Sequence, residues 1–187
     1  MIIEECTFRD CTSLKEIVIP DSVTEIRGTE SYYDDNGAFS GCTSLAKVKL
    51  SNNLTIIEEG TFRDCTSLTE IVIPDGVTEI RGEWDDYDRH NGAFSGCTSL
   101  KEIVIPDSVT SIGRSAFSGC TSLTEIVIPD SVTGIGEYAF SGCTSLSKVK
   151  LSSNLTIIAA GTFSGCRSLT EIVIPDSVTE IRTESYY

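Results

Sequence analysis

The sequence predicts a mostly β solenoid, in which one supersecondary unit is stacked on copies of itself. Three observations lead to this fold class. The string CTSLTEIVIPDSVT recurs along the 187 residues, and its cysteine returns every 23 residues from Cys97 to Cys166. A repeat of roughly 20–50 residues is typical of solenoids. No segment has the length or the periodicity of a helix. We therefore interpret residues 1–187 as a single solenoid of about seven repeats, which grows by adding coils.

Each repeat begins with a short strand, which the copy that starts at Cys120 illustrates. The spacing Leu-x-x-Ile-x-Ile, which ends at Ile128, alternates with period two and ends in β-branched residues, as a short strand does. We expect Ile126 and Ile128 to point into the coil, and Glu125 and Val127 to point out. Because every coil advances the chain in the same direction, like strands of successive coils can pair only in parallel.

A proline closes this strand, and a second extended piece follows it. Proline has no amide hydrogen to donate to a ladder, so Pro129 marks the place where pairing stops. The same slot holds Pro20, Pro74, Pro106 and Pro175. Residues 132–135 then form a second, shorter extended piece, and Gly136 begins the return to the next coil. We expect helix to be scarce.

The repeat resembles that of the BspA-like leucine-rich repeat family. The resemblance is carried by Leu-x-x-Ile-x-Ile-Pro-x-x-Val-x-x-Ile, followed by Ala-Phe-x-x-Cys-x-x-Leu, over nearly the whole chain. It implies a right-handed leucine-rich-repeat solenoid with a parallel β-sheet on its concave face. It also implies a surface or secreted protein of a host-associated microbe with an adhesive role. The family brings no catalytic residues to carry over.

Composition excludes several functions. The formal net charge of −14 argues against nucleic acids and anionic membranes, which bind basic surfaces. No apolar run approaches the length of a membrane span, and the first residues have no signal-peptide pattern. An enzyme would need a clustered acid, base and nucleophile. We find no such cluster in the sequence, so we expect neither catalytic activity nor a cofactor. We expect the partner to be a protein.

The cysteines are expected to be buried thiols. Seven of the eight hold one slot of the repeat: Cys11, Cys42, Cys65, Cys97, Cys120, Cys143 and Cys166. Stacked in register they form a ladder about 4.8 Å apart, where parallel side chains fit the torsion of a disulfide poorly. Free cysteine packs as a small hydrophobe, an interpretation that we favour over disulfides or a metal site. Cys6 lies outside the ladder, and we expect it to be the most exposed thiol.

The outward positions of the first strand form one candidate binding surface. They carry glutamate and valine in most repeats, and lysine in two: Lys47, Lys49, Lys148 and Lys150. One interpretation is a ligand surface of valine stripes in an acidic frame, with these lysines as contacts. The other is strand chemistry alone, because valine suits a pleated surface and lysine between glutamates relieves repulsion across strands. We favour the second interpretation.

Two insertions, at 27–36 and 81–91, are the stronger candidates. They lengthen the repeat by eight and nine residues and hold aromatic and acidic side chains. The candidate ligand-binding residues are Tyr32, Tyr33, Asp34, Asp35, Trp84, Asp85, Asp86, Tyr87, Asp88 and His90. Aromatic anchors with polar neighbours are typical of binding hot spots, although a merely solvated loop explains the insertions equally well. The aspartates could bind calcium, but no known calcium-loop pattern fits, so we expect no metal site.

The ends of the sequence are incomplete repeats. Residues 2–11 match 56–65 at nine of ten positions, so the sequence starts halfway through a repeat, and it ends with a copy of 29–33. We interpret the chain as a fragment of a longer array. Coils without polar caps leave apolar surface and open strand edges, which predicts self-association through the ends. The alternative to a binding protein is a structural or engineered repeat scaffold with no dedicated ligand.

Overall fold

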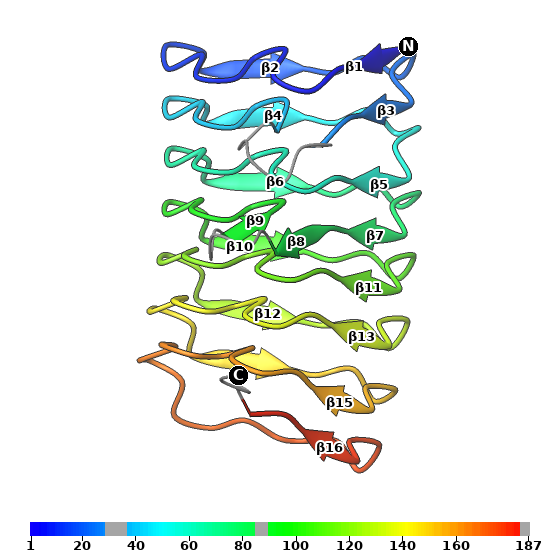
Figure 1. Cartoon of the computed structure of the whole chain (residues 1–187), viewed down its shortest axis with the longest axis vertical. Helices are drawn as coiled ribbons and strands as arrows, with labels where there is room; N and C mark the ends of the chain where they lie inside the picture. Colours follow the sequence, from blue (N-terminus) through cyan, green and yellow to red (C-terminus); the bar gives the residue numbers. More distant parts are fainter. Residues whose placement is uncertain (29–36, 85–89, 184–187) are drawn as a thin grey trace.

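The computed structural model describes residues 1–28, 37–84 and 90–183, and the structural statements below concern these residues (Figure 1). They contain strands and turns but no helix. The coils stack along the longest axis of the molecule, with the N-terminus at one end of the stack and the C-terminus near the other. The predicted mostly β solenoid and the predicted scarcity of helix are confirmed.

The first strands of successive repeats build what we call the first ladder, which ends before the last coil, where residues 171–173 form no strand. Its members are β2 (Glu16–Val18), β4 (Lys47–Lys49), β6 (Glu70–Val72), β10 (Glu102–Val104), β12 (Glu125–Val127) and β14 (Lys148–Lys150). The pairs β2–β4, β6–β10 and β12–β14 are parallel and in register. In addition, β4 lies next to β6, and β10 lies next to β12. Parallel pairing is therefore confirmed.

The second extended piece builds a second ladder, at the side of the stack where Figure 1 draws β3, β5 and β7. Its members are β1 (Ile2–Ile3), β3 (Glu25–Ile26), β5 (Ile56–Ile57), β7 (Glu79–Ile80), β11 (Ser111–Ile112), β13 (Gly134–Ile135), β15 (Ile157–Ile158) and β16 (Glu180–Ile181). These strands also pair in parallel, because they too come from successive coils.

Alternation along each strand separates the core from the surface as predicted. Ile126 and Ile128 are buried, whereas Glu125 and Val127 of the same repeat are exposed. The core also contains a stack of phenylalanine rings, one per coil, formed by Phe8, Phe39, Phe62, Phe94, Phe117, Phe140 and Phe163. Neighbouring ring centroids lie between 5.1 and 5.7 Å apart, within the range of favourable aromatic stacking.

The cysteine ladder is partly as predicted. The eight cysteines are free thiols, and those of the inner coils are buried: Cys42, Cys65, Cys97, Cys120 and Cys143. Each donates its S–H to the phenylalanine carbonyl of the preceding coil, as Cys97 does to Phe62 at 3.1 Å. Burial raises the pKa of Cys42 to about 11 and that of Cys143 to about 12. These values keep the thiols protonated.

At the ends of the ladder the prediction of burial is wrong. Cys11 is exposed and Cys166 is only partly buried. Cys11 belongs to the first coil, so no preceding coil covers it, and Cys166 lies in the last coil of the stack. Cys6 is exposed, as predicted. Apolar side chains of the same end coils, including Ile2, are also exposed, and self-association through these ends stays a prediction.

Candidate functional site

Exposed valines form a column on the outward face of the first ladder. Val72, Val104 and Val127 occupy the last position of β6, β10 and β12. Their exposed fractions are 80%, 76% and 54%, respectively. They point outward because the isoleucines beside them point into the core. We call these three residues the valine column.

Glutamates line one side of the valine column. Glu70 and Glu102 lie directly opposite each other on β6 and β10. Like charges in this position repel. Glu125 follows on β12 and has a partner in Lys148, 4.0 Å away. Within the described residues, no cation lies at ion-pair distance from Glu70 or Glu102.

Aspartates line the other side, three residues after each valine. Asp75, Asp107 and Asp130 are all exposed. Asp130 accepts a hydrogen bond from the backbone N–H of Ser153 in the next coil, at 2.8 Å. This bond, with a smaller contribution from Lys150, lowers the pKa of Asp130. The valine column therefore lies between two rows of carboxylate side chains.

The face is hollowed along its length. A hollow of about 600 Å³ extends over β2, β4, β6 and β10 and includes Val72 and Val104 in its lining. A second hollow of about 550 Å³ continues over β10 and β12, from Glu102 to Lys150, and includes Val127. A hollowed apolar surface with polar groups on its sides is the usual form of a binding site.

The four candidate lysines lie on this same face and bound the valine column. Lys47 and Lys49 belong to β4 on one side, and Lys148 and Lys150 belong to β14 on the other. Glu16 lies opposite Lys47 and Glu125 opposite Lys148, which is the register that the expected relief of repulsion across strands requires. Contact of these lysines with a ligand stays a prediction.

Most of the insertion candidates lie outside the described residues. This applies to Tyr32, Tyr33, Asp34 and Asp35, and to Asp85, Asp86, Tyr87 and Asp88. Trp84 and His90 are described only in their backbone. They face each other in an antiparallel pair, β8 (Gly82–Trp84) with β9 (His90–Gly92). The second insertion therefore begins as a short hairpin, whereas the repeat pattern indicated only a loop.

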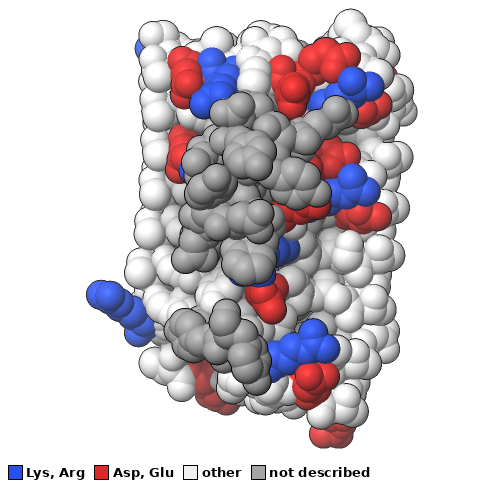
Figure 2. Space-filling view, viewed as in Figure 1, with Lys and Arg blue, Asp and Glu red and all other residues white. Residues whose placement is uncertain are grey.

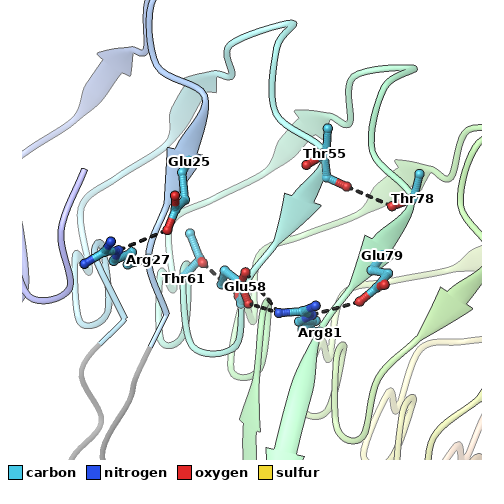
Figure 3. Close-up of polar contacts among 8 residues, drawn as sticks. All are labelled: Glu25, Arg27, Thr55, Glu58, Thr61, Thr78, Glu79 and Arg81. Carbon is cyan, nitrogen blue, oxygen red and sulfur yellow. Dashed lines mark hydrogen bonds and ion pairs between the residues drawn. The ribbon is translucent and has the colours of Figure 1, made fainter. Parts of the chain in front are cut away.

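The base of each insertion is held by an arginine that the sequence interpretation did not select. Arg81, just before β8, contacts Glu79 at 2.8 Å and Glu58 of the preceding coil at 3.0 Å (Figure 3). Arg27 contacts Glu25 at 3.0 Å in the same way. The signal is visible in the sequence, because Glu-Ile-Arg precedes both insertions. Figure 2, drawn from the same side as Figure 1, shows neighbouring acidic and basic groups along the side of the stack where the second ladder lies.

Two further polar contacts surround the second insertion. Arg63 donates a hydrogen bond from Nη1 to Oδ1 of the buried Asn91, at 3.2 Å. Glu59 lies beside Glu58 and near Glu83, and burial, together with these charges, raises its pKa to about 7. The hydrogen bond from Arg63 ties the second insertion to the preceding coil, and Glu59 lies buried among like charges at its base.

Asn53 and Asn154 each begin an Asn-Leu-Thr sequence, which matches the pattern of an N-glycosylation site, and both side chains make structural contacts. The side-chain amide of Asn53 donates to the carbonyl of Asp21 at 2.7 Å, and that of Asn154 donates to the carbonyl of Asp130 at 2.8 Å. Each asparagine thus ties one coil to the preceding coil. Attachment of a glycan would remove this hydrogen bond.

Metal and membrane sites find no support in the part of the chain that the structure describes. No group of three or more His, Cys, Asp or Glu residues there has the arrangement of a metal site. Within the same ranges, no helix is long and apolar enough to cross a membrane. The aspartates for which calcium was considered lie in the insertions, outside the described residues.

Comparison with known proteins agrees with this architecture. The family model described as BspA type leucine rich repeat region matches residues 1–84 and 90–187. A leucine-rich repeat protein of T. pallidum is 33% identical, with a TM-score of 0.63, and the match covers 97% of this chain and 66% of that protein. One from Bacteroides ovatus is 32% identical, with a TM-score of 0.65, and the match covers 98% of this chain and 37% of that protein. No curated protein matches the chain. The chain thus spans less than two thirds of the length of either solved relative.

Proposed function

Because this chain belongs to the BspA type leucine-rich repeat family, we propose that it is a non-enzymatic protein-binding solenoid of a surface or secreted protein. The observation that carries the proposal is the valine column, which lies in a hollow on the first ladder. Soluble monomers rarely expose contiguous apolar patches without a use, and such patches are typical of interaction sites. We propose an adhesive role for the longer protein of which this array would be a part.

The energetics favour binding at this face. Burying each valine of the column against a partner contributes up to about 1.5 kcal/mol. The backbone beneath the column is held by parallel pairing, and the stacked phenylalanines lie inside the same coils. The binding surface is therefore already ordered before a partner binds, and little conformational entropy is lost on association. A larger share of the interaction free energy then contributes to affinity. We propose that the insertions, with Trp84 and Tyr87, supply a second set of contacts.

The test is a selection for binders followed by mapping. A displayed library of extracellular protein fragments is selected on the immobilised chain, and each clone is then measured on two variants. The first combines Val72→Thr with Val104→Thr, which replaces exposed methyl groups by hydroxyls and preserves β propensity. The matched control is Val173→Thr, which changes a valine of the same slot, 71% exposed, outside the two hollows.

We expect most clones to lose about 10-fold or more in affinity for the double variant and to keep full affinity for the control. Clones that are insensitive to the double variant but lose binding after Trp84→Ala would assign recognition to the insertions instead. Failure to recover any specific clone would favour the structural scaffold.

A further inference from the structure

We propose that the partner segment recognised by the valine column is a basic amphipathic α-helix that lies along the solenoid axis. This inference rests on the proposed function and specifies its partner. Two independent features of the face support it: the spacing of the valines along the axis, and the charge on both sides of them.

The spacing of the valines fits a helix. Strands of a sheet lie about 4.8 Å apart, so the two steps from Val72 through Val104 to Val127 cover about 9.6 Å. Residues i and i+7 of an α-helix lie about 10.5 Å apart, and i+3 or i+4 lies between them on the same face. Three apolar side chains of one helix stripe can therefore each meet one valine.

An extended peptide fits the same column poorly. Its side chains on one face are about 6.8 Å apart, so three of them cover about 13.6 Å and do not match the spacing of about 4.8 Å between coils. The first ladder is also paired internally at β6 and β10, so this face offers the partner side chains and no strand edge. The helix is thus the secondary structure whose side-chain spacing the valine column matches.

The charge on the two sides of the column requires cations in the partner. Glu70 and Glu102 repel each other across β6 and β10, and a cation placed between them would relieve this repulsion. Asp75 and Asp107 lie on the opposite side of the valines and are exposed. Lys47 and Lys49 of β4 and Lys150 of β14 line the same hollows, but among the described residues no ion pair joins them to these four carboxylates.

A helix of about 10 Å diameter that rests its apolar stripe on the valines extends towards both rows of carboxylates. Lysine or arginine on either side of the stripe would then reach the glutamates on one side and the aspartates on the other, because their long side chains extend past the apolar contact. The complement of this face is therefore a helix with leucine-like residues at i, i+3 or i+4, and i+7, and basic residues on both sides.

The test uses a synthetic peptide of about 18 residues with this pattern, measured by fluorescence anisotropy on the whole chain. One control peptide has the same composition with the leucines scattered around the helix, and a second has glutamate in place of the basic residues. The protein variants are Val72→Thr with Val104→Thr, and Glu70→Gln with Glu102→Gln. The matched controls, Val173→Thr and Glu171→Gln, change the same slots in another coil.

We expect the patterned peptide to bind about 10-fold more tightly than the scattered peptide, and the acidic peptide not to bind. Each double variant should bind the patterned peptide with about 10-fold lower affinity, and the matched controls should bind it with unchanged affinity. An increase from about 0.05 to about 0.5 M salt should weaken binding several-fold. Equal binding of the patterned and scattered peptides would overturn the inference, because net charge alone would then explain attraction. Loss of binding in the matched controls would also overturn it.

The two proposals fail separately. If clones from the library selection depend on Val72 and Val104, but neither contain such a helix nor are displaced by the peptide, the protein-binding function stands and the helical partner is wrong. Displacement of these clones by the patterned peptide alone would support both.

Discussion

The stacked phenylalanines are the part of the core whose contribution can be tested most directly, by Phe117→Ala. Phe117 is fully buried, and its ring stacks on Phe94 at 5.3 Å and on Phe140 at 5.4 Å between centroids. Replacing a buried phenylalanine by alanine costs about 3–5 kcal/mol in the free energy of unfolding. We expect the upper part of this range, because two ring contacts are lost and each contributes about 0.5–1.5 kcal/mol.

Phe163 provides the internal comparison. It holds the same slot but is only partly buried, and Phe140, 5.7 Å away, is the described ring on which it stacks. Phe163→Ala should therefore cost about half as much as Phe117→Ala, roughly 2 kcal/mol. Urea unfolding of both variants, followed by circular dichroism, gives the two free energies.

The central variant should also change the shape of the transition. Each coil contacts only its neighbours, so a defect in the middle of the stack weakens the coupling between its two halves. We expect a lower dependence of the free energy on urea for Phe117→Ala, and an unchanged one for Phe163→Ala. Equal losses for both variants, or a loss below about 1 kcal/mol for Phe117→Ala, would refute the view that stacking between coils stabilises the solenoid.

Three further outcomes are expected. Glu59→Ala, which introduces the residue of the equivalent slot at Ala160, should stabilise the chain by about 1–2 kcal/mol at pH 8 and by nothing near pH 4. The sign follows from the pKa of Glu59, which burial raises to about 7 in the native state. The native state therefore binds this proton more tightly than the unfolded state, and the stability of the wild-type chain falls as pH rises from 4.5 through 7. Thermal unfolding of both chains across pH checks this, and an equal effect of the substitution at pH 4 and pH 8 would contradict it. Thiol titration of the native chain should show fast reaction of Cys6 and Cys11 and slow reaction of the buried ladder, whereas fast reaction of more than three thiols would indicate that the ladder is open. Asn91→Ala should lower the free energy of unfolding by about 1–2 kcal/mol because the bond from Arg63 is lost, and a chemical denaturation curve that matches wild type would show that this bond does not hold the hairpin.

The candidate site was only partly predictable from the sequence. The outward positions of the first strand, including the valines and the four lysines, followed from alternation within one repeat. Valine stripes in an acidic frame were one interpretation of these positions, but the hollows along them depend on how the coils lie next to each other in space. The second insertion separates β6 from β10 by 29 residues in the sequence, yet the two strands pair directly and bring Val72 beside Val104.

The sequence by itself determined the features that belong to a single repeat. The 23-residue period set the coil, the alternation of Ile126 and Val127 set inside and outside, and the proline slot set the end of the strand. These features are local, since adjacent side chains of a strand must point to opposite faces whatever lies beyond them. Parallel pairing followed as well, because every coil advances in the same direction.

Only the tertiary structure decided the features that depend on contact between coils. The ring stack and the thiol bonds to phenylalanine carbonyls require neighbouring coils at a particular rise, which no single repeat contains. Cys11 shows this most clearly. Residues 8–14 have the same sequence as residues 62–68, yet Cys11 is exposed and Cys65 is buried. The difference arises because Cys11 lies in the first coil of the structure, where no neighbouring coil covers that side. Burial in a stacked array is a property of the neighbour and not of the residue, since each coil protects only the surface that the adjacent coil covers.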